Sequence, residues 1–104
     1  MPNKAGRSTE HDIALAVIRY LASLPEGDAT IVRIVKHAPD FIGLTEPDMD
    51  ASTTRPNERV WEQQVRNIVS HRFTEGNAIN DGLLSYSPGH IGITDAGRTW
   101  LARR

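Results

Sequence analysis

The sequence contains no cysteine, and Lys4 and Lys36 are the only lysines among its 12 basic residues. The lack of cysteine excludes disulfides, zinc sites built from thiolates and cysteine nucleophiles, and it fits a reducing compartment. No apolar run approaches the roughly 20 residues that a membrane span needs. The first nine residues are polar and lack the apolar core of a signal peptide. We therefore expect a cytoplasmic protein that begins with a disordered arm over residues 1–9.

The sequence also lacks the motifs of catalysis and cofactor binding. It has no glycine-rich phosphate loop and no nucleophile elbow. Its four histidines, which are His11, His37, His71 and His90, do not have the spacing of metal ligands. No pair of acid and base groups suggests a reaction. These absences predict a protein that is not an enzyme and that uses no cofactor, metal or small-molecule ligand.

The 104 residues, of which 38% are hydrophobic, suffice for one small core. We expect a single domain over residues 10–104. Apolar spacing, helix caps and turn residues predict helices at 10–24, 31–38, 57–73 and 95–102, and strands at 83–87 and 90–93 around the turn Pro88-Gly89. We expect Asn77 to cap one further turn that Gly82 ends in the left-handed conformation.

The predicted order is three helices, a β-hairpin and a last helix. This order indicates a mainly α fold with a small β-hairpin, the winged helix-turn-helix. In that fold the third helix of the three-helix core enters the major groove of DNA and the two-stranded hairpin forms the wing, here followed by a C-terminal helix.

Several segments of the second half resemble a known family. These are Trp61-Glu-Gln-Gln-Val-Arg-Asn-Ile-Val-Ser-His-Arg72, Gly82-Leu-Leu84, Pro88-Gly89 and Ile93-Thr-Asp-Ala-Gly-Arg98. They are similar to the winged-helix domain at the N-terminus of Mrr-type restriction endonucleases, and the resemblance covers roughly residues 28–101. Similar domains accompany bacterial nucleases of the HNH type, and the last segment also occurs in many other winged-helix regulators. The resemblance implies a DNA-recognition module of a bacterial defence or regulatory system.

The resemblance does not imply nuclease activity, because the cleavage residues of Mrr-type proteins lie in a separate C-terminal domain. A nuclease site of that type also needs an acidic residue two positions before a lysine, to hold Mg²⁺ and polarise water. Neither Lys4 nor Lys36 has one.

One face of the predicted third helix carries the candidate DNA contacts. Arg59, Gln63, Arg66 and Ser70 lie opposite Trp61 at helical spacing, and Asn67 flanks them. None of the five side chains is acidic. Arginine recognises guanine, and glutamine or asparagine recognises adenine, through paired hydrogen bonds. This face is either a DNA-contacting surface or an ordinary solvated helix face.

Further candidates lie on both sides of this helix. Thr54 and Arg55 precede it and Asn57 lies at its start, where they serve either as phosphate contacts or as a polar loop that caps the helix. His90 lies at the tip of the predicted wing, and the two-residue tip is too short for deep insertion into the minor groove. For Arg72 we expect a structural role, by pairing with a carboxylate such as Asp81 or Asp95, in preference to a DNA contact.

The first helix has a second apolar stripe of Leu15, Ile18 and Ala22. A surface helix of a small monomer needs one such stripe, so this one is either covered by the chain after Pro39 or forms a dimer contact. The formal net charge is −1, yet residues 55–104 carry seven arginines against five acids. We expect double-stranded DNA binding, as a transcriptional regulator or a recognition module, with a second copy or a separately encoded nuclease as further partner. The alternative is a protein-interaction domain that does not bind DNA.

Overall fold

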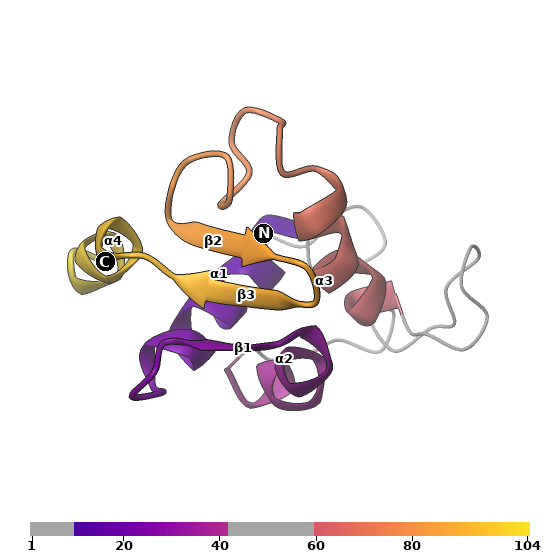
Figure 1. The fold of residues 1–104 in the computed structure, drawn as a ribbon, viewed down its shortest axis with the longest axis horizontal. Helices are drawn as coiled ribbons and strands as arrows, with labels where there is room; N and C mark the ends of the chain where they lie inside the picture. Colours follow the sequence, from indigo (N-terminus) through magenta and orange to yellow (C-terminus); the bar gives the residue numbers. More distant parts are fainter. Residues whose placement is uncertain (1–9, 42–59) are drawn as a thin grey trace.

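The computed structural model describes residues 10–41 and 60–104, which form a small α/β domain (Figure 1). Its elements follow in the order α1 (Glu10–Ala22), β1 (Asp28–Thr30), α2 (Ile31–His37), the 3-10 helix η1 (Ala38–Phe41), α3 (Val60–Ser70), β2 (Leu84–Ser87), β3 (His90–Ile93) and α4 (Asp95–Ala102). The predicted helices and both predicted strands are present, with shorter bounds for the first three helices. The predicted arm at 1–9 and residues 57–59 of the predicted third helix lie outside the described residues.

Helix α1 lies behind the sheet and is the central element of the core (Figure 1). Ile13, Val17 and Leu21 recur at helical spacing and are fully buried. The helix packs against α3, η1, α4 and β3. Because these elements surround α1, it fixes the position of α3 relative to the sheet.

The strand β1 was not predicted from the sequence. It pairs antiparallel with β3, so that Ala29 faces Ile91, and β3 pairs with β2 on its other side. The strand order is β1-β3-β2. β1 spans only Asp28–Thr30, which is too short for an alternating apolar pattern to be recognised. The predicted hairpin is therefore part of a three-stranded sheet.

Side chains cap two helices and one turn of the structure. The hydroxyls of Thr30 and Thr94 accept hydrogen bonds from Arg33 N and Gly97 N at the starts of α2 and α4. Asn77 Oδ1 accepts from Ile79 N and Asn80 N at 2.8 and 3.2 Å. Gly82, with φ +81°, ends that turn in the left-handed region, as predicted.

Of the second apolar stripe of α1, Ile18 belongs to the core. Ile18 is only 1% exposed, whereas Leu15 and Ala22 are half-buried. Leu15 and Ile18 share a cavity of about 80 Å³ with Leu83 and Trp100. The chain before β2 and helix α4 therefore approach the stripe, and the prediction that Ile18 forms a dimer contact is wrong.

Candidate nucleic-acid interface

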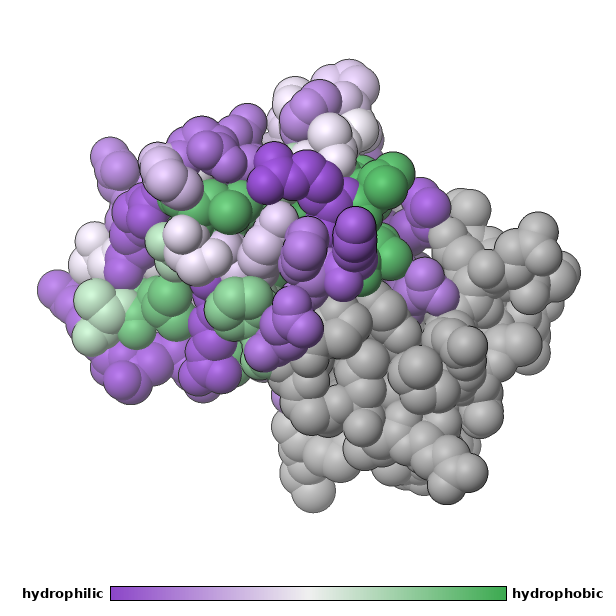
Figure 2. Space-filling model, turned by 90° about the horizontal axis from the view of Figure 1, so that it is seen from below, coloured by the Kyte–Doolittle hydropathy of each residue, from purple (hydrophilic) through white to green (hydrophobic). Residues whose placement is uncertain are grey.

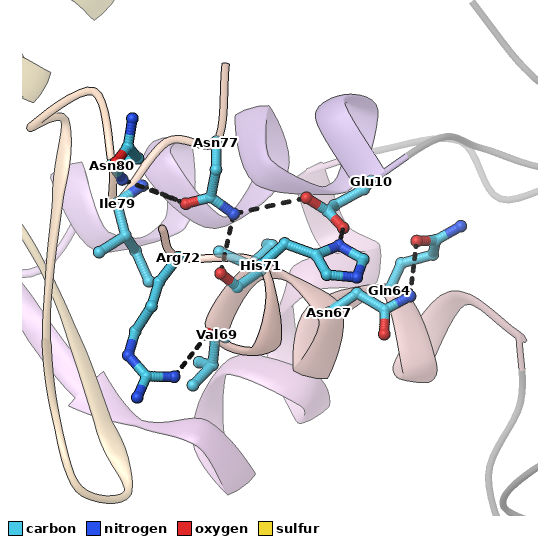
Figure 3. Close-up of polar contacts among 10 residues, drawn as sticks. Glu10, Gln64, Asn67, Val69, His71, Arg72, Asn77, Ile79 and Asn80 are labelled. Carbon is cyan, nitrogen blue, oxygen red and sulfur yellow. Dashed lines mark hydrogen bonds and ion pairs between the residues drawn. The ribbon is translucent and has the colours of Figure 1, made fainter. Parts of the chain in front are cut away.

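The predicted DNA-contacting face lies on α3, opposite the side that packs into the core. Val65 and Ile68 are fully buried. Gln63, Arg66 and Asn67 are half-buried and Ser70 is exposed. Their spacing of three and four residues aligns these four side chains on one face of the helix. The amide of Asn67 donates to Gln64 Oε1 at 3.3 Å, which links the face to the adjacent side of α3 (Figure 3).

The other predicted contacts near this helix cannot be placed. Thr54, Arg55, Asn57 and Arg59 lie outside the described residues. The described part of the predicted face therefore consists of Gln63, Arg66, Asn67 and Ser70. Arg66 is the one cation among these four residues.

The hairpin formed by β2 and β3 is short and anchored at its tip. Ile31 N donates to Gly89 O at 2.9 Å, so the turn is tied to the first residue of α2. His90 is exposed at the start of β3, and its Nδ1 lies 3.3 Å from Pro88 O. The hairpin is therefore short, and its turn is held against the start of α2.

Arg72 connects the end of α3 to the hairpin, but not by the predicted ion pair. Its Nη1 donates to Val69 O at 2.9 Å, and its Cζ lies 4.8 Å from the ring centroid of Phe73 and 5.0 Å from that of Tyr86. The predicted pairing with Asp81 or Asp95 is wrong. Because the chain turns after Ser70, the guanidinium faces aromatic rings and a carbonyl.

Sequence reasoning did not identify Phe73 and Tyr86 as candidate site residues. Phe73 is 82% exposed and Tyr86 is 36% exposed, and both contact the same guanidinium. The two residues are far apart in the sequence and belong to different elements. The adjacent Arg72-Phe73 pair was a signal in the sequence, but the partner on β2 required the tertiary structure.

A polar cluster joins the end of α3 to the start of α1 (Figure 3). His71 Nδ1 lies 2.6 Å from Glu10 Oε1. Asn77 Nδ2 donates to Ile68 O at 2.9 Å and lies 3.4 Å from Glu10 Oε2. His71 and Arg72 therefore point to different sides of α3, His71 toward α1 and Arg72 toward the hairpin.

The same cluster lines a cavity of about 350 Å³, together with His11, Thr74 and Glu75. The cavity lies between α1 and the turns that follow α3. Within residues 10–41 and 60–104, no three His, Asp or Glu side chains are grouped so that they could hold a metal ion. The cluster is best explained by its hydrogen bonds, which fix the end of α3 against α1.

No family model, curated protein or solved structure matches the chain. Among the described helices, none combines the length and the apolar character required to cross a membrane. The face of α3 and the hairpin are therefore the features from which we infer a function.

Proposed function

We propose that this domain is a winged helix that binds double-stranded DNA through α3, with the β2–β3 hairpin as its wing. The element order supports this assignment, because α1, β1, α2, α3, β2 and β3 follow one another as in a winged helix. The pairing of β1 with β3 adds support, since it joins the first half of the chain to the base of the wing.

The composition of the α3 face that points away from the core carries the proposal. Gln63, Arg66, Asn67 and Ser70 are all hydrogen-bonding side chains, and none is acidic. They lie on the side of the helix away from the buried Val65 and Ile68. Side chains of these types form paired hydrogen bonds with base edges or single bonds with phosphates. An adjacent hairpin, anchored to α2 through Gly89, offers a second edge for the DNA backbone.

The biological role that we infer is that of a transcriptional regulator or of the recognition module of a bacterial restriction system. The resemblance of segments 61–72 and 93–98 to the Mrr-type winged helix supports this role. In such a system the domain supplies recognition, and a separate nuclease supplies cleavage.

Substitution of Arg66 tests the proposal directly. We expect Arg66→Ala to weaken binding to a short labelled duplex by about 1–3 kcal/mol if the side chain contacts guanine. If it contacts a phosphate, the variant instead lowers the salt slope of the affinity by about 1. Fluorescence anisotropy over a series of salt concentrations measures both quantities.

Arg19→Ala is the matched control, because it removes the same charge from an exposed position on α1. We expect this variant to bind as the wild type does. Equal effects of the two substitutions, or no duplex binding at low salt, would contradict the proposal. In that case a protein-interaction domain becomes the better explanation.

The structure offers less support for that alternative than the sequence did. The stripe that suggested a dimer contact includes Ile18, which is in the core. Figure 2 views the molecule from below Figure 1, and on the described part of this face hydrophilic residues interrupt the apolar areas. Neither observation favours a broad apolar interface, so DNA binding is the function that we propose.

A further inference from the structure

The junction between α3 and the hairpin exposes the aromatic ring of Phe73. Phe73 is 82% exposed, and burial of a phenylalanine side chain is normally favourable by about 1.5–3 kcal/mol. A single exposed apolar residue is common in proteins. Phe73 differs because the guanidinium of Arg72 lies over its ring and also over the ring of Tyr86.

Arg72 holds the assembly in place through three contacts. Its guanidinium lies near the Phe73 and Tyr86 rings, with its Cζ at 4.8 and 5.0 Å from their centroids. The guanidinium also donates to Val69 O at 2.9 Å. A ring that is held in position loses less conformational freedom when it binds a partner. We name Arg72, Phe73 and Tyr86 the aromatic platform.

The chemistry of the platform indicates the kind of partner. Aromatic rings and a guanidinium plane stack on nucleobases, and the stacking tolerates any base because each base has a π-face. The positive charge at the centre of the platform favours a partner that also carries negative charge. An unpaired nucleotide offers both a planar ring and an anionic phosphate, whereas an apolar protein segment offers no charge.

We propose that the aromatic platform stacks on an unpaired base of DNA that is bound at α3. This inference rests on the proposed function and adds a preference to it. A duplex keeps its bases stacked on each other, so it cannot present a free base to Phe73. In this inference, a displaced or bulged base stacks on Phe73 while the paired part of the same DNA contacts α3.

The test compares two labelled duplexes that differ by one bulged 2-aminopurine. We expect the wild type to bind the bulged duplex about 10-fold more tightly than the fully paired duplex. The fluorescence of 2-aminopurine should decrease on binding, because stacking quenches it. We expect Phe73→Ala to abolish both effects and to leave the affinity for the paired duplex unchanged.

Two further variants separate stacking from general effects. Phe73→Tyr keeps a ring and should retain the preference. Val32→Ala removes another exposed apolar side chain, which is 78% exposed on α2, and should also retain it. Circular dichroism checks that each variant is folded, and we expect no change because Phe73 is largely outside the core.

The outcomes distinguish this inference from the proposed function. Equal wild-type affinity for both duplexes, or an undiminished preference in Phe73→Ala, overturns the stacking inference while Arg66→Ala still tests duplex binding. Sedimentation of the wild type and of Phe73→Ala gives a further outcome. If the substitution changes the mass of the particle and not the DNA preference, the platform is a protein contact and the inference is wrong.

Discussion

Asn77 illustrates how one side chain stabilises two neighbouring turns. It is 5% exposed, and it is the one buried polar residue among residues 10–41 and 60–104. Its oxygen accepts from the backbone of Ile79 and Asn80, and its nitrogen donates to Ile68 O near the end of α3. A buried amide is stable when both of its ends have partners. Asn77 therefore fixes the chain that leads from α3 to β2.

We expect Asn77→Ala to lower the free energy of unfolding by about 2 kcal/mol, because a capping acceptor and a buried donor are lost together. Asn77→Asp keeps the acceptor and loses the donor, so it should also destabilise the protein. Urea denaturation measures both variants. The control is Asn80→Ala at an exposed position, for which a change within about 0.5 kcal/mol is expected. Equal effects at positions 77 and 80 would contradict the assigned role.

At the scale of the element, α4 is positioned by its first turn. The hydroxyl of Thr94 accepts from Gly97 N at 2.9 Å, and its single proton is within reach of Gly82 O at 2.5 Å and Leu83 O at 3.1 Å. Gly97 is buried against the Leu83 carbonyl, and a Cβ at this position would also lie 2.9 Å from Ile93 Cγ1. Because glycine has no side chain, α4 can approach the chain at Leu83, just before β2, closely. Trp100 and Leu101 then pack against the core.

The prediction at this scale concerns the cap of α4. Thr94→Ala should lower the free energy of unfolding by about 1 kcal/mol, because the Gly97 N–H loses its acceptor. Thr94→Ser retains the hydroxyl and should cost clearly less. Thermal and urea unfolding followed by circular dichroism distinguish the two variants. A serine variant as unstable as the alanine variant would show that the methyl group, and not the hydroxyl, is what α4 needs.

At the scale of the whole molecule, α1 is covered on both of its apolar sides. On one side Tyr20 packs against the rings of His37 and Phe41, with centroids 5.3 and 5.8 Å apart. On another side Ile18 lies near Leu83 and Trp100. The two halves of the chain thus share one core around α1, and β1 pairs with β3 across the same division.

Ile18→Glu should abolish cooperative folding, with a loss of more than about 4 kcal/mol, because a buried carboxylate would lack a partner. Leu15→Glu is the matched variant, since Leu15 is half-buried on the same helix. It should fold and sediment with the same mass as the wild type. Circular dichroism and sedimentation provide the two measurements. A folded Ile18→Glu variant, or a lower mass for Leu15→Glu, would restore the dimer interpretation of this stripe.

The local elements of this protein could be predicted from the sequence because their signals are local. Thr94 is followed by a helix, Pro88-Gly89 forms the hairpin turn, and Gly82 adopts the left-handed conformation that ends a turn. The face of α3 follows from helical spacing alone. Each of these features depends on residues within a few positions of one another, so the pattern of side chains suffices.

Only the tertiary structure decided the features that join distant residues. The pairing of Ala29 with Ile91 is one of them, and it turned a predicted hairpin into a three-stranded sheet. The contacts of Arg72 with Phe73 and Tyr86, and of Glu10 with His71, are others. Such contacts depend on how the elements pack around α1, and no spacing in the sequence encodes that packing directly. The sequence determined the helices, the turn and a candidate DNA-contacting face, and the packing decided which side chains lie beside that face.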